Sequence, residues 1–216
     1  LAEEEPTVHL IMTISNHPPY DIDLAAEGID LAEIEKALQG RTERPEQLAL
    51  KVGHYRYMDK TVTDFVRRTM AAYPDSIFVI TGDHSIRMDP AAQSTLFEHE
   101  SVPFVLYGNG VTKDILPKDV VGGHTAIVPT LIELIAPEGF SYTSIARSMT
   151  EGTKYAFNSD CWIAREAMGN VDDDRMELLP GIASPQEDLV AEREAALYEV
   201  AAMRTISRIL IGDMEQ

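Results

Sequence analysis

The sequence IFVITGDHS, residues 77–85, joins an unbroken apolar run to a short polar segment. Residues Ile77–Ile80 are apolar and mostly β-branched, which is typical of a strand buried on both faces. Gly82 then predicts a turn, and Asp83 and His84 follow directly. In open parallel α/β sheets, ligands bind beyond the carboxyl ends of the strands, so this pair stands where a binding site is expected.

Strands and helices are predicted to alternate on either side of this stretch. Apolar runs predict strands over residues 8–14, 76–83 and 102–110, and a strand with a turn over 154–165. Helical spacing and end signals predict one or two helices over residues 23–40, closed by Gly40, and helices over 44–74 and 141–149. Residues 122–139 are predicted as a loop that enters a helix with Pro129 in its first turn. A last helix is predicted over residues 184–212, started by a Ser184–Glu187 capping box and stopped by Gly212. We therefore predict an α/β fold with a mostly parallel sheet covered by helices on both faces, in one domain over residues 1–216.

Composition limits the classes of function. The chain has 216 residues and a net charge of −18, from 36 acidic residues against 18 lysines and arginines. Such a surface repels a phosphate backbone, so nucleic-acid binding is not expected. The single cysteine, Cys161, excludes an internal disulfide, and no apolar run reaches the roughly 18 residues that a membrane-spanning helix needs.

Four residues that could bind a metal or an anion lie at or near predicted strand ends or the start of a helix. They are His17, Asp83, His84 and His124. One carboxylate with one imidazole suits Mn²⁺ or Zn²⁺ better than Ca²⁺, and the chain offers no pair of thiolates. From spacing alone, the alternative that Asp83 only caps a turn stays open.

Three motifs in order add a family resemblance. TGDHS, with SNHPPY before it and GGHTAIVPTLIELI after it, resembles the sulfatase branch of the alkaline phosphatase superfamily. The likeness is closest to the lipoteichoic-acid synthase and phosphoglycerol transferase group, and it covers about residues 8–160. It implies an alkaline phosphatase/sulfatase-like fold that is incomplete at its N-terminal side.

The resemblance implies a role for each of the four residues. Asp83 and His84 would be ligands of a divalent metal, with Mn²⁺ expected ahead of Zn²⁺ or Mg²⁺. His17 would contact the phosphate or sulfate of the substrate. His124 stands where two-metal members carry a histidine ligand, and a second-metal role, a substrate role and a plain loop role all stay open.

The resemblance also implies that the nucleophile lies upstream of this sequence. We therefore expect residues 1–216 to be the C-terminal portion of the catalytic domain, without esterase activity of their own and with weak metal affinity. Cys161 and Arg165 have the spacing of the cysteine motif that sulfatases convert to formylglycine, but Ile163 occupies the proline position. We expect Cys161 to be a small buried apolar residue instead.

Two functional hypotheses follow. The first is a metal-dependent hydrolase or transferase that acts on phosphate or sulfate esters, such as a small ester or a lipid-linked glycerophosphate. In this reading the domain is extracytoplasmic and belongs to a membrane-anchored protein, and His17 donates a hydrogen bond to a non-bridging oxygen in a two-step transfer. The alternative is a non-catalytic binding or assembly module that keeps the sulfatase-like fold.

Overall fold

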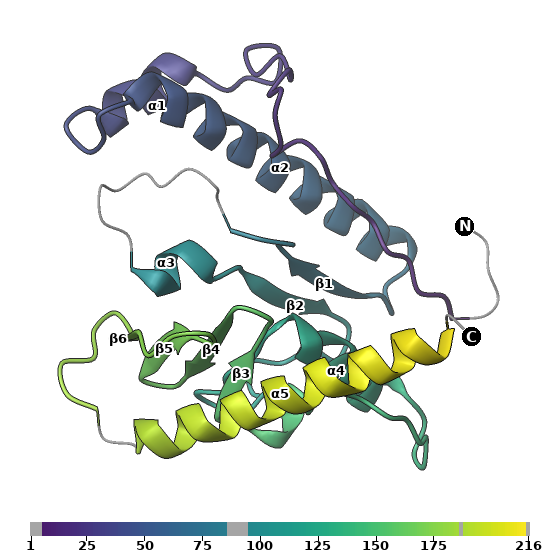
Figure 1. Ribbon diagram of the computed structural model, residues 1–216. Helices are drawn as coiled ribbons and strands as arrows, with labels where there is room; N and C mark the ends of the chain where they lie inside the picture. The colour runs from purple at the N-terminus through teal and green to yellow at the C-terminus, as the bar shows by residue number, and fades with distance from the viewer. Residues whose placement is uncertain (1–5, 86–94, 186–187, 215–216) are drawn as a thin grey trace. The chain divides into compact units, whose positions relative to one another are not determined.

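The computed structural model describes residues 6–85, 95–185 and 188–214 (Figure 1). Its residues form two compact units. Among the described residues, the first comprises residues 6–80 and 105–109, and the second comprises residues 81–85, 95–104, 110–185 and 188–214. The assignment of both units to one catalytic domain over residues 1–216 stays a prediction.

Two helices dominate the first unit. α1 (Leu31–Leu38) starts where the Asp30 carboxylate accepts hydrogen bonds from the next turn, and α2 (Pro45–Ala72) has proline at its first position. The two helices pack closely because Gly53 of α2 has no side chain: a Cβ there would lie 2.8 Å from Cδ2 of Leu31, the first residue of α1. The helix predicted over residues 44–74 is confirmed, and of the one or two predicted over 23–40 the structure has one, over residues 31–38, preceded by turns.

The strand predicted over residues 8–14 is wrong. These residues form no strand, and the side chains of Val8, Leu10, Ile11, Met12 and Ile14 are 61–95 % exposed. A strand needs a neighbour for its backbone N–H and C=O groups, and none of the described residues pairs with this segment. An apolar, β-branched sequence is therefore not sufficient to make a strand here.

β1 (Ile77–Thr81) and β2 (Phe104–Gly108) form a two-stranded sheet, as their apolar sequences predict. The amide of Asn109, just after β2, donates to the carbonyl of Ser76, just before β1, at 3.1 Å. The end of β2 thus lies beside the start of β1, so the two strands run in opposite directions. Phe78 of β1 meets Phe65 of α2 edge-to-face, with ring centroids 6.3 Å apart.

The second unit contains a four-stranded antiparallel sheet. Its strands are β3 (Tyr155–Phe157), β4 (Cys161–Ala164), β5 (Ala167–Asn170) and β6 (Met176–Leu178), paired in that order. Short turns connect them, and parallel neighbours would need crossovers of about a dozen residues or more. The α/β class is thus confirmed, whereas the expected mostly parallel sheet is absent among the described residues.

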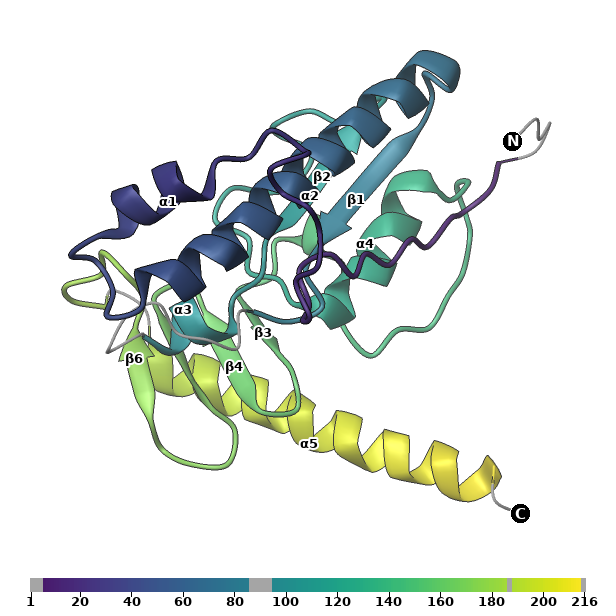
Figure 2. The same ribbon diagram turned by 90° about the horizontal axis from the view of Figure 1, so that it is seen from above.

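The core of the second unit lies between this sheet and α5 (Leu189–Met214). Figure 2 shows α5 running along the sheet, where it contacts β3 and β4. Trp162 is fully buried, and Ala164, Ala196 and Val200 pack with it. Gly169 lies opposite Trp162 on the next strand, and a Cβ there would be 2.7 Å from the indole Nε1.

Three shorter helices complete the second unit. α3 (Leu96–Glu100) begins with a Thr95–Glu98 capping box, and η1 (Met149–Glu151) is a single 3₁₀ turn. α4 (His124–Ile135) contains Pro129 in its interior, not in its first turn as predicted, because the helix starts as early as His124. The helix predicted over residues 141–149 is wrong, since η1 starts only at its last residue.

One of the two end signals assigned to the C-terminal helix can be compared with α5. The helix continues through Gly212 to Met214, so the predicted stop at Gly212 is wrong. Glycine in a helix costs only about 1 kcal/mol relative to alanine, which a long helix tolerates. The capping box at Ser184–Glu187 includes two residues outside the described part. No helix of the described residues is long and apolar enough to cross a membrane.

Candidate functional site

The turn after β1 presents two of the predicted metal ligands. Gly82 packs against Val102, and a Cβ at Gly82 would lie 3.4 Å from both Val102 Cγ1 and the His84 carbonyl. The Asp83 Oδ1 accepts a hydrogen bond from the His84 amide at 3.0 Å, which fixes the carboxylate on the turn. The second oxygen, Oδ2, lies 3.7 Å from His84 Nε2.

The hydrogen bonds of His84 determine which ring nitrogen can bind a metal. Its Nδ1 lies 2.7 Å from the Ser85 carbonyl, which can only accept, so Nδ1 carries the proton. In the neutral ring Nε2 then has the free lone pair, and a backbone carbonyl at the other nitrogen is the usual support of a metal-bound histidine. The side chains of Asp83 and His84 are 84 % and 45 % exposed, so both can reach a cation from solvent.

His124 docks on the same turn. It is the first residue of α4, and its Nε2 lies 2.7 Å from the Gly82 carbonyl. Nε2 is therefore the protonated nitrogen and Nδ1 is free to accept or to bind a ligand. The structure thus brings His124 to the backbone of the turn that carries Asp83 and His84, although the choice between its metal, substrate and loop roles stays a prediction.

The described residues provide a pair of ligands and no complete metal site. No group of three or more His, Cys, Asp or Glu side chains converges within residues 6–85, 95–185 and 188–214. An oxygen from Asp83 and a nitrogen from His84 fit Mn²⁺ or Zn²⁺ by ligand type. The donors fit a divalent metal in chemistry, and a tight site would need further ligands.

His17 lies in the first unit, in the turn that follows residues 8–14. The turn is closed by a 3.0 Å hydrogen bond from the His17 amide to the Ile14 carbonyl, and the imidazole is exposed. Its Nδ1 lies 3.2 Å from the Pro18 carbonyl, so Nε2 is free to face solvent. The convergence of His17 with Asp83 and His84 at one end of a sheet stays a prediction.

Residues on α2 support the segment that carries His17. The Tyr20 ring packs edge-on against His54 at 5.1 Å, and the Lys51 ammonium lies 6.0 Å from the Tyr20 ring centroid. His54 is fully buried and donates from Nδ1 to the Leu50 carbonyl, so its role here is structural. Burial lowers the pKa of Lys51. Sequence reasoning did not single out Lys51, because its burial is a property of the folded unit and not of a local motif.

Cys161 is buried on β4, as expected. Burial, followed by the nearby carboxylates of Glu100, Asp160 and Asp173, raises the pKa of its thiol to about 11. A thiol of this kind is a poor nucleophile at neutral pH. The two remaining histidines, His9 and His99, are exposed and have local partners in Thr7 and Glu100.

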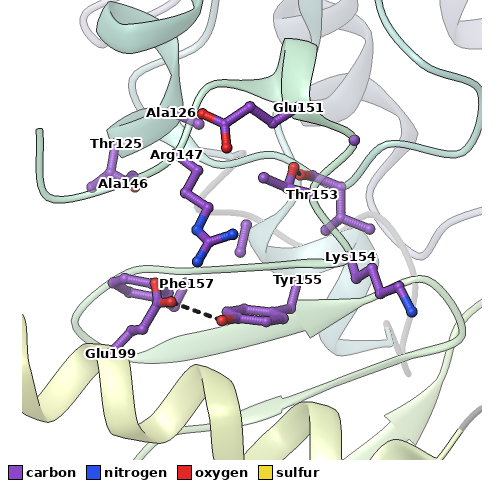
Figure 3. Close-up of a pocket in the computed structure, with 13 residues that line it drawn as sticks. Thr125, Ala126, Ala146, Arg147, Glu151, Thr153, Lys154, Tyr155, Phe157 and Glu199 are labelled. Atoms are coloured by element: carbon purple, nitrogen blue, oxygen red, sulfur yellow. Dashed lines mark hydrogen bonds between the residues drawn. The ribbon is translucent and has the colours of Figure 1, made fainter.

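A pocket of about 300 Å³ lies within the second unit, and sequence reasoning did not find it (Figure 3). Its walls come from the first turn of α4, from residues 146–157 and from α5. Tyr155 donates a hydrogen bond to Glu199 Oε1 at 2.7 Å. Burial and this bond raise the pKa of Tyr155 to about 12, so the hydroxyl stays protonated. In Figure 3 the guanidinium of Arg147 points toward this pair.

Comparison with known protein families shows which family the chain belongs to. The Sulfatase family model matches residues 1–136 of the 216, so the chain belongs to the sulfatase family. The comparison with curated proteins and the comparison with solved structures each gave no match. His17, Asp83, His84 and His124 all fall within the matched residues, whereas most of the pocket lies beyond them. Membership supports a sulfatase-family hydrolase or transferase, and this family generally uses a divalent metal.

Proposed function

We propose that this chain forms part of the active site of a metal-dependent enzyme that transfers or hydrolyses phosphate or sulfate esters, in the manner of a phosphoglycerol transferase. The observation that carries the proposal is the Asp83–His84 pair after β1. Asp83 offers a free carboxylate oxygen, and the Ser85 carbonyl leaves the lone pair of His84 on Nε2. Asp83 Oδ2 and His84 Nε2 lie 3.7 Å apart on exposed side chains, so both can be ligands of one cation.

The residues have distinct roles in this proposal. Asp83 and His84 would hold the metal, with Mn²⁺ expected ahead of Zn²⁺ or Mg²⁺, and a bound ion would supply Lewis-acid polarisation of the ester. His17, when both ring nitrogens carry a proton, donates from Nε2 to a non-bridging oxygen whose charge grows in the transition state. His124 steadies the turn through the Gly82 carbonyl and keeps Nδ1 available for a second metal or for the substrate.

The substrate and the location belong to the same proposal. The SNHPPY segment and the Asp-His pair favour phosphoglycerol transfer over sulfate hydrolysis, so we propose a small or lipid-linked glycerophosphate as the ester. By the same resemblance to phosphoglycerol transferases, we propose that the domain is extracytoplasmic and belongs to a membrane-anchored protein. The rival, a non-catalytic module, is favoured by one observation: no third ligand joins Asp83 and His84 among the described residues.

The test is the binding of glycerol 3-phosphate by calorimetry with and without Mn²⁺. We expect Mn²⁺ to strengthen binding, and Asp83→Asn to remove that gain. His17→Gln should weaken glycerol 3-phosphate about tenfold, the value of one charge-assisted hydrogen bond, and leave Mn²⁺ affinity unchanged. His99→Gln, which changes an exposed histidine outside the proposed site, is the matched control. Ester binding that ignores Mn²⁺ would favour the module, and sulfate that competes better than phosphate would favour a sulfatase.

A further inference from the structure

The pocket beside α4 and α5 contains opposite charges that have not formed ion pairs. Arg147 makes no ion pair within 4.0 Å with a described residue, and neither do Glu151 and Glu199. Figure 3 shows the Arg147 side chain extending into the space between them, with Glu151 on one side and Glu199 on the other. In a chain of net charge −18, a guanidinium close to two carboxylates would be expected to pair with one of them.

The carboxylate of Glu199 is held in a fixed orientation. Tyr155 occupies its Oε1 from β3, so Oε2 is left to accept another hydrogen bond. Because the pKa of Tyr155 is about 12, its hydroxyl keeps donating at neutral pH. Glu199 therefore presents a negative charge to the pocket from α5, and Arg147 presents a planar positive group from the loop before η1.

The volume limits what can bridge these groups. About 300 Å³ is at the small end of the range, roughly 300–1,000 Å³, in which ligand pockets fall. A guanidinium recognises a carboxylate or a phosphate with two parallel hydrogen bonds, and a carboxylate recognises an ammonium group. A molecule with one acid group and one ammonium group a few bonds apart satisfies both walls at once.

We propose that this pocket binds a small zwitterion, with its acid group on Arg147 and its ammonium group on Glu199. The pocket lies in the second unit, and Arg147, Tyr155 and Glu199 lie beyond the residues that match the sulfatase family, so the site is additional to the Asp83–His84 pair. Thr125, the neighbour of His124 in the first turn of α4, also lines the pocket. A bound zwitterion would thus touch the helical turn that places His124 on the Gly82 carbonyl.

Three probes of nearly the same size separate the possibilities: β-alanine has both charges, propionate only the acid and propylamine only the ammonium group. Binding to the intact chain is followed by NMR shifts of pocket residues. We expect β-alanine to bind at least about tenfold more tightly than either single-charge probe, which corresponds to about 1.4 kcal/mol. Equal binding of propionate would make the pocket an anion site, equal binding of propylamine would make it a cation site, and no binding at all would also overturn the proposal.

Two charge-removing variants assign the ends of the ligand. Arg147→Gln should weaken β-alanine and propionate about tenfold and leave propylamine unchanged. Glu199→Gln keeps an oxygen acceptor for Tyr155, and it should weaken β-alanine and propylamine but not propionate. Arg208→Gln and Glu194→Gln, on exposed positions of α5, are the controls. An unchanged β-alanine affinity in either pocket variant would refute the assignment, and the comparison of the three probes holds even if a variant does not fold.

Discussion

The hydroxyl of Thr130 joins α4 to the turn that leads into the pocket, and replacing it with valine tests how that turn is held. Thr130 is fully buried. Its Oγ1 donates to the Ala126 carbonyl at 2.6 Å and accepts from the Met149 amide at 2.9 Å. Thr130→Val keeps the shape of the side chain and removes both hydrogen bonds.

The cost comes mainly from Met149. The Ala126 carbonyl still has the Thr130 amide, its ordinary partner in a helix, whereas the buried Met149 amide loses its acceptor. An unsatisfied buried amide costs about 1–3 kcal/mol. In a chain of this size each kcal/mol lowers the melting temperature by about 2–4 °C, so we expect a fall of roughly 2–12 °C.

The assay combines thermal unfolding with hydrogen exchange at the Met149 amide. Thr130→Ser, which keeps the hydroxyl and loses one methyl group worth about 0.8 kcal/mol, is the matched control. We expect the Met149 amide to stay protected in Thr130→Ser and to exchange rapidly in Thr130→Val. A valine variant that melts with the wild type and keeps the Met149 amide protected would refute the reasoning.

Three further predictions concern the second unit. Gly169→Ala should lower the free energy of unfolding by about 1–3 kcal/mol, because its Cβ would lie 2.6 Å from the Arg175 carbonyl and 2.7 Å from Trp162 Nε1. An unchanged free energy of unfolding in urea would contradict this packing. The raised pKa of Tyr155, about 12, favours the protonated form in the folded chain. The stability that this shift provides is complete below pH 10 and should be lost as the pH rises from about 10 to about 12. Tyr155→Phe should reduce that loss, as measured by the free energy of unfolding at about pH 10 and at about pH 12. Cys161 should react with iodoacetamide at pH 8 only after unfolding, because burial raises the pKa of its thiol to about 11. Labelling is followed by mass spectrometry, and rapid labelling of the folded chain would contradict this prediction.

Local sequence signals predicted the elements whose stability is local. α2 follows from helical spacing with Pro74 just beyond its end, and β1 and β2 follow from unbroken apolar runs. The same kind of run failed at residues 8–14, because a strand depends on a partner that its own sequence does not specify. The direction of the sheets was wrong for a related reason: the pairing of β1 with β2, and of β3 through β6, is a tertiary property.

The part of the candidate site that consists of adjacent residues could be predicted from the sequence. Asp83 and His84 lie on one turn after one strand, so a motif captures them, and His124 meets that turn through the start of α4. The pocket was not predictable, because Arg147, Tyr155 and Glu199 come from a loop, a strand and a helix that meet only in the folded unit. No spacing in the sequence relates these three residues.

Mn²⁺ binding followed by electron paramagnetic resonance tests the central claim most directly, namely that Asp83 and His84 hold a divalent metal. With two ligands from the turn, we expect binding with a dissociation constant above about 1 µM, since a complete coordination shell is needed for a tight site. Asp83→Asn and His84→Gln should each abolish it, and Asp114→Asn, which changes an exposed aspartate outside the site, should not. Mn²⁺ affinity that is unchanged in Asp83→Asn would contradict the assignment of this turn as the metal site.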